Sequence, residues 1–232
     1  MSEAIEPPRG LVIAAGCWII ASFLVAFGLR LPLHLSPSTL APTVQLILLT
    51  TASGMMIAWP LLRLSQPPRD RTIARTVIDA LTLACLWQLL VWPLRLATPW
   101  PTERTLLIDL LALASLAGVA GLVAAASAWR SSILRALAMA ACILVAVGIS
   151  MPLAALGFQP SPFSAVFMGG IPTLLTVMNS EGSLPNEIDW ENLVVISVVS
   201  GALCVVGLLF AAAASNRPPT RSNQVASGRR VG

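Results

Sequence analysis

Six long apolar segments run through this sequence, and they constrain its fold more than any other feature. The hydrocarbon core of a bilayer is about 30 Å thick, and a helix needs about 20 apolar residues to cross it. Segments that approach or exceed this length occupy residues 11–29, 41–62, 76–94, 105–129, 133–157 and 192–215. The sequence therefore predicts an all-α integral membrane protein with six transmembrane helices in one domain, residues 11–215.

The composition supports this prediction. The chain of 232 residues is 56% hydrophobic and only 10% charged, whereas a soluble domain carries about 25% charged residues. Its mean hydropathy is +0.84. A soluble fold of this size could not hide so much apolar surface from water, so we expect the lipid bilayer to be the main partner of the chain.

The basic residues predict how the chain is oriented. All fourteen are Arg, and eleven of them fall in the segments on one side of the predicted membrane. Anionic lipid and the membrane potential hold basic loops in the cytoplasm. We therefore expect both termini to be cytoplasmic in a bacterial-type inner membrane. Residues 1–10 form a short N-terminus, and residues 216–232 form a disordered basic tail.

The predicted outer loop, residues 158–191, has an unusual composition. It contains four acidic residues and no basic one. Its apolar stretch is too short to cross a bilayer and is interrupted by Gly169, Gly170 and Pro172. Such a stretch is typical of a short re-entrant or interfacial helical segment, which we place between the fifth and sixth transmembrane helices.

Three proline residues lie near the ends of predicted spans, namely Pro60, Pro93 and Pro152. Proline lacks the backbone donor and clashes with the carbonyl one turn earlier, so we expect kinks or early helix ends at these positions.

The basic loop after the second span contains Arg69, Asp70 and Arg71. These residues are candidates for docking a cytoplasmic partner. The alternative is an ordinary basic loop that only fixes the orientation of the chain.

Small residues recur at four-residue spacing in two spans. The candidate helix-packing residues are Ala117, Gly121 and Ala125 in the fourth span and Ser197 and Gly201 in the sixth. In lipid, such rows let helix backbones approach closely. We expect this packing within the bundle, with a dimer contact as the alternative.

Two acidic residues fall inside predicted spans, and an acid inside a membrane is a functional hypothesis by default. Asp79 lies near the cytoplasmic side and Asp109 near the outer side. One interpretation is a proton relay. Because the two residues lie near opposite faces, we favour local ion pairs that reach the headgroup region.

Residues with catalytic chemistry are scarce in this sequence. The chain has no Lys, a single His and no CxxC motif. This excludes a P-loop lysine, a Schiff-base lysine and a zinc finger. We therefore expect no enzyme activity, no cofactor and no metal site. The basic residues are spread over loops without an aromatic platform, so we expect no nucleic-acid binding either.

Two functions fit these observations. The six spans, the basic loop and the outer helical segment resemble the topology of ABC-2-type export permeases, which implies a transport subunit that needs a separate ATPase. The sequence departs from that pattern because the residues before the first span are too few for an amphipathic entry helix. The alternative is a non-catalytic structural subunit or assembly factor of a larger membrane complex, for example a respiratory one.

Overall fold

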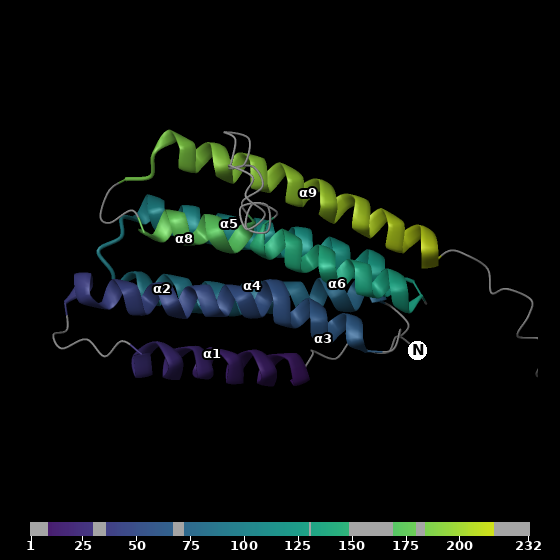
Figure 1. Cartoon of the computed structure of the whole chain (residues 1–232), viewed down its shortest axis with the longest axis horizontal. Helices are drawn as coiled ribbons and strands as arrows, with labels where there is room; N and C mark the ends of the chain where they lie inside the picture. Colours follow the sequence, from purple (N-terminus) through teal and green to yellow (C-terminus); the bar gives the residue numbers. More distant parts are fainter. Residues whose placement is uncertain are drawn as a thin grey trace, which may run out of the picture.

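The structure is a computed structural model, and it describes residues 9–29, 36–66, 72–129, 131–148, 169–179 and 184–215. Within these ranges the chain is helical and contains no strand, and the helices lie roughly along one common axis (Figure 1). Five helical segments are long and apolar enough to cross a membrane: Arg9–Gly28, Pro37–Ser65, Ile73–Arg95, Thr102–Ser127 and Glu187–Ala214. This architecture is compatible with an all-α, multi-pass membrane protein, as the sequence predicts.

One helix organises the bundle. Helix α5, Thr102–Ser127, contacts α4, Thr72–Arg95, and α6, Ser132–Val147, as well as the helices that follow in the chain. Helix α1, Arg9–Leu29, and helix α9, Glu187–Ser215, lie at opposite edges of the bundle in Figure 1. Most residues of α5 on the sides that face its neighbours are buried.

The second predicted span consists of three consecutive elements: α2, Pro37–Ser53, the π-helical turn η1, Gly54–Ala58, and α3, Trp59–Ser65. Ser36 caps the start of α2, because its hydroxyl accepts a hydrogen bond from the Thr39 N–H while the Thr39 hydroxyl accepts one from the Ser36 N–H. This reciprocal capping box explains why the helix begins before the apolar run that marks it in the sequence.

Helix α9 also begins earlier than the apolar run predicts. The Asn186 side chain accepts a hydrogen bond of 2.8 Å from the Asp189 N–H, and the Asp189 carboxylate accepts one of 3.0 Å from the Asn186 N–H. Acidic residues in the first turn also suit the positive end of the helix dipole. These polar contacts extend the helix beyond its apolar part.

The fifth predicted span differs most from the prediction. Helix α6 ends at Val147 rather than near residue 157, and residues 149–157 lie outside the described ranges. Its 16 residues make it about 24 Å long, less than the roughly 30 Å of a hydrocarbon core. Helix α8, Gly170–Asn179, continues from the end of α6 toward the other end of the bundle (Figure 1). Helix α6 alone is therefore too short for the crossing that the sequence predicts at residues 133–157.

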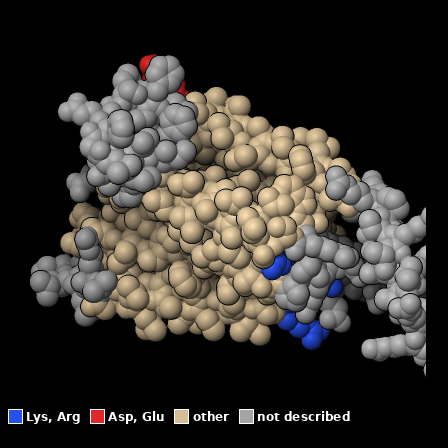
Figure 2. Space-filling view, turned by 45° about the vertical axis from the view of Figure 1, so that its right-hand side comes forward, with Lys and Arg blue, Asp and Glu red and all other residues tan. Residues whose placement is uncertain are grey.

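The two ends of the bundle differ in charge. The end formed by Arg63, Arg75 and Arg135 is called the basic end here, and the end where α9 begins is called the acidic end. Figure 2 shows acidic atoms near one end of the visible face, Arg atoms near the other, and a broad uncharged surface between them. An uncharged band between charged ends is the pattern expected of a bundle that crosses a bilayer.

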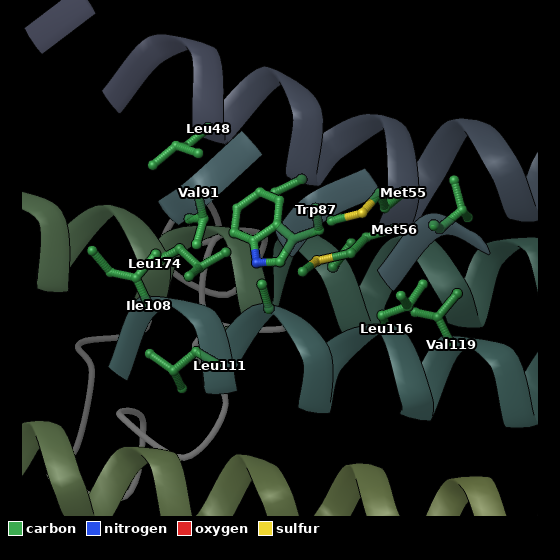
Figure 3. Packing of buried hydrophobic residues seen from close by; sticks show 14 of the residues in the cluster. Leu48, Met55, Met56, Trp87, Val91, Ile108, Leu111, Leu116, Val119 and Leu174 are labelled. Atoms are coloured by element: carbon green, nitrogen blue, oxygen red, sulfur yellow. The ribbon is translucent and has the colours of Figure 1, made fainter. Parts of the chain in front are cut away.

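The core is centred on Trp87 of α4, which is fully buried. Figure 3 shows its indole among Met55 and Met56 of η1, Leu174 of α8 and residues of α5. Helices in lipid associate through close packing, because lipid chains are as apolar as the helix surfaces. This cluster holds α2, η1, α4, α5 and α8 together.

Candidate functional site

The junction between α6 and α8 lies inside the bundle. Gly148, the residue that follows α6, has φ 85° and ψ 157°, a conformation that is essentially restricted to glycine. Gly169 lies against the backbone of Val147 and Gly148 so closely that a Cβ would overlap it. Both junction glycines therefore meet backbone requirements that a larger residue does not satisfy.

The first turn of α8 penetrates between two other elements. Gly170 is buried, and a Cβ built on it would lie 2.5 Å from Ser115 Oγ of α5 and 3.2 Å from Met56 Sδ of η1. The Thr173 hydroxyl donates a hydrogen bond of 3.0 Å to the Gly169 carbonyl. The first turn of α8 therefore packs among core side chains of the bundle.

The opposite end of α8 is attached to α2. The Gln45 side chain donates a hydrogen bond of 2.8 Å to the Met178 carbonyl in the last turn of α8. The start of α6 is attached to the basic end in the same manner, because Arg135 donates a hydrogen bond of 2.8 Å to the Gln66 carbonyl. These two contacts fix the far ends of the α6–α8 pair.

The π-helical turn η1 lies beside the α6–α8 junction. The backbone N–H of Trp59, the first residue after the turn, donates a hydrogen bond to the Gly54 carbonyl five residues earlier. Proline at position 60 cannot donate to the Met56 carbonyl and would clash with it, which explains why the helix widens here. The expected distortion at Pro60 thus takes the form of a π-helical turn.

The outer flank of this turn is the docking point for α1. The Trp18 indole donates a hydrogen bond of 2.8 Å to the Thr50 carbonyl. A Cβ built on Gly54 would lie 2.5 Å from the indole nitrogen of Trp18. Glycine at this position therefore lets the indole approach the backbone of the widened helix.

A polar network surrounds Asp109 inside the bundle. Its carboxylate accepts hydrogen bonds from Trp87 Nε1, 3.0 Å, and from Gln88 Nε2, 2.9 Å to each oxygen. The Gln88 carbonyl in turn accepts a bond of 2.7 Å from Trp92 Nε1. Asp109 is 4% exposed and lies about 10 Å along the axis from Thr102 at about 1.5 Å per residue.

This environment differs from the ion pair that we expected for Asp109. Among the described residues, the Asp109 carboxylate accepts hydrogen bonds from neutral N–H donors and forms no salt bridge. The Arg nearest to Asp109 in the sequence is Arg104. Arg104 instead is fully buried and lies in electrostatic range of Asp189 of α9, because its helical position points it toward another neighbour.

Asp79 does form the expected type of contact. Its carboxylate pairs with Arg63 Nε of α3 at 3.6 Å, and Arg75 lies within electrostatic range. The Asp79 partners belong to the basic end, whereas Asp109 lies toward the acidic end. The structure therefore does not bring the two acids together into one relay.

Close backbone contact joins α5 and α9. A Cβ built on Gly121 would lie 2.5 Å from Cys204 Cα, and one built on Gly118 would lie 3.0 Å from the Ser200 side chain. Gly207 lies directly against the Gly121 backbone. Gly121 thus lies in a close helix–helix contact, as expected of a helix-packing residue.

The row on α9 differs from the one that we expected. Ser197 and Gly201 are exposed, and no atom lies within 4 Å of a Cβ built on Gly201. The contact row is offset from them and contains Ser200, Cys204 and Gly207. Helical rows one residue apart point about 100° apart, and spacing alone does not identify which of them faces α5. Ala117 and Ala125 are half-buried on α5.

The remaining candidates have no described site. Arg69, Asp70 and Arg71 lie outside the described residues, as does Pro152. Pro93 lies in the last turn of α4, which ends at Arg95. Within the described ranges, no group of three His, Cys, Asp or Glu side chains could hold a metal ion. The four cysteines are all free.

Sequence reasoning missed two parts of this region. The first is the pair of donors, Trp87 and Gln88, that holds Asp109. The second is the meeting of Gly148 with Gly169, although both glycines are visible in the sequence. No family model, no curated protein and no solved structure matches this chain.

Proposed function

We propose that this chain is the membrane subunit of a transporter, permease-like with an ABC-2-type topology, that works with a separate ATPase. The observation that carries the proposal is the α6–α8 junction in the interior of the bundle. Non-helical backbone at membrane depth is tolerated only where protein buries it or where it lines a cavity. Discontinuous helices of this kind form the substrate sites of many transporters.

Two neighbouring features support the same proposal. The π-helical turn η1 packs beside the junction, and π-helical turns occur frequently at functional sites. Ser115 and Gly170 give the junction a close contact with α5. A junction bounded by glycines and a widened helix can change its backbone angles at low cost, which suits alternating access.

The energy source must come from another polypeptide in this proposal. The chain contains no Lys, so it cannot form the P-loop that binds the phosphates of ATP. In a bacterial-type inner membrane with both termini in the cytoplasm, the basic end faces the cytoplasm. The loop with Arg69, Asp70 and Arg71 then lies on the side where an ATPase would dock.

Affinity purification of the full-length chain from its native membrane in mild detergent tests the proposal. We expect a stoichiometric P-loop ATPase to co-purify, as identified by mass spectrometry. The double charge reversal R69E/R71E should release the ATPase, whereas the matched reversal R229E/R230E in the tail should not. Recovery of the chain without any ATPase, under conditions that preserve other membrane complexes, would overturn the proposal.

The alternative is a structural subunit or assembly factor, and the exposed apolar faces of the edge helices favour it. Leu24 of α1 and Leu209 of α9 are 70% and 65% exposed, so each edge helix offers an apolar surface to lipid or to a partner helix. In this case subunits of a respiratory or another membrane complex should co-purify. The R69E/R71E variant should then retain them.

A further inference from the structure

A groove of about 300 Å³ lies between α4, α5 and α9. Helix α5 packs against both other helices, whereas α4 and α9 make few contacts with each other, so the groove lies over α5. Its wall is almost entirely apolar and contains small side chains such as those of Ala84, Ala117 and Ala120. Small-molecule sites have volumes of about 300–1,000 Å³ and often lie between the helices of bundles. The groove is therefore large enough for a small ligand.

The rows of side chains that line the groove lead to Asp109. On α4, Ala80 and Ala84 line the groove, and Gln88 follows at the same four-residue spacing. On α5, Leu113 lines the groove, and Asp109 lies four residues before it. Residues four apart share one face of a helix, and Gln88 donates to both oxygens of Asp109 at 2.9 Å. The acid and the amide thus lie one helical turn beyond the groove, toward the acidic end.

The environment of Asp109 is suited to a cation. The side chain is 4% exposed, and among the described residues it forms hydrogen bonds with indole and amide N–H groups but no ion pair. A carboxylate inside a membrane usually pairs with a cation. The Gln88 amide nitrogen occupies the position between the two oxygens where a charged N–H donor would bind more strongly.

The Gln88 side chain separates the carboxylate from the groove. Gln88 is half-buried, and its carbonyl accepts its hydrogen bond from the exposed Trp92 rather than from the core. A rotation of this one side chain would therefore open Asp109 to the groove without a change in the backbone.

We propose that this groove binds a lipophilic primary amine in its protonated form, with the ammonium on Asp109 in place of the Gln88 amide. An ammonium has three N–H donors and can contact both oxygens, while the hydrocarbon chain lies along α5 in the groove. An anion would find no opposite charge in the apolar wall and would lose its hydration without compensation. The inference concerns binding alone and does not depend on the proposed transport function.

The dimensions of the groove limit the hydrocarbon chain. The levels of Thr76 and Ala84, which line its two ends on α4, are about 12 Å apart at about 1.5 Å per residue. An octyl chain suits this length. Leu81 of the groove wall is 60% exposed, so the ligand enters from the lipid phase.

Titration calorimetry of the purified full-length chain in a neutral detergent tests the proposal. We use octylamine, which is cationic at neutral pH, as the probe, with 1-octanol and octanoate as the neutral and anionic analogues of the same length. Octylamine should give a saturable heat, and the analogues should bind at least about tenfold more weakly, because they lack the charge-assisted hydrogen bond to Asp109. Equal affinities of octylamine and 1-octanol would show that the groove holds only hydrocarbon and would overturn the proposal.

Two matched pairs of variants locate the site. Asp109→Asn keeps the shape of the side chain and should weaken octylamine binding about tenfold, whereas Asp79→Asn, the same change at the other buried acid, should not. Ala84→Leu fills the groove and should abolish the saturable heat, whereas Ala140→Leu on the exposed face of α6 should not. Octylamine binding that Asp109→Asn leaves unchanged would overturn the proposal. If Asp109→Asn does not fold, the comparison of octylamine with 1-octanol on the wild type decides.

Discussion

The indole N–H of Trp87 donates a hydrogen bond of 3.0 Å to the carboxylate of Asp109, deep in the contact between α4 and α5. The same indole ring packs against Met56 of η1 and Leu174 of α8 (Figure 3). One side chain therefore connects the polar network around Asp109 with the elements that surround the α6–α8 junction.

Replacement of Trp87 by phenylalanine tests this connection. The Trp87→Phe variant keeps an aromatic ring but removes one of the three N–H contacts to Asp109. Because the buried carboxylate loses a donor, we expect a loss of about 1–3 kcal/mol in stability. Thermal unfolding in detergent measures the change, with Trp190→Phe at a partly exposed site as the control. Equal midpoints for the two variants would show that the hydrogen bond does not stabilise the fold.

The contact between α5 and α9 gives a second prediction. Gly121→Leu should lower the unfolding temperature markedly, because its side chain would overlap the backbone of Cys204 and Leu203. Gly201→Leu should leave the temperature nearly unchanged, because the space around Gly201 is open. The pair compares the same substitution on two helices that cross the same bundle. If Gly201→Leu lowered the unfolding temperature as much as Gly121→Leu, this face of α9 would pack against a second chain.

The ion pair at the basic end gives a third prediction. Arg63→Gln should destabilise the protein, because it leaves Asp79 buried without its closest cation. We expect a loss of about 1–3 kcal/mol, which lies between the values typical of exposed and of buried ion pairs. The double variant Arg63→Gln/Asp79→Asn should recover part of that loss. A double-mutant cycle of unfolding free energies measures the coupling. Additive effects would mean that the 3.6 Å contact contributes nothing.

The conformation of Gly148 gives a fourth prediction. Because φ is 85° at this residue, Gly148→Ala should cost about 1–3 kcal/mol in backbone strain. Gly16→Ala in α1 should instead increase stability by up to about 1 kcal/mol, because alanine favours a helix more than glycine does. Nothing lies within 4 Å of the new Cβ. Comparison of the unfolding midpoints of the two variants decides whether the break after α6 is built into the fold.

The sequence was sufficient to predict where most helices lie. Helices α1, α4, α5 and α9 overlap the predicted spans closely, because long apolar runs have few alternatives to a helix in a bilayer. Their ends were less predictable. The caps of α2 and α9 depend on Ser36 and Asn186, whose polar contacts lie beyond the apolar runs.

The candidate site was harder to predict, because it depends on contacts between distant segments. An apolar run such as residues 133–157 gives no sign that its helix ends at Val147. The partner of Asp109 lies on another helix, and the sequence shows only the nearby Arg104. The offset between the expected row with Gly201 and the observed row with Cys204 depends on the rotation of α9, which small-residue spacing does not determine.

The central claim is that α8 begins inside the bundle, beside α5. A cross-link between Ser115→Cys and Gly170→Cys tests it most directly, in a chain whose four native cysteines are replaced. The Cβ positions lie 3.0 Å apart, so a small shift reaches the roughly 3.5–4.5 Å of a disulfide. We predict an intramolecular disulfide in native membranes after oxidation, and none between Ser115→Cys and Leu175→Cys on the exposed side of α8. The absence of a cross-link, together with labelling of Gly170→Cys by a membrane-impermeant maleimide, would contradict the claim and place α8 at the membrane surface.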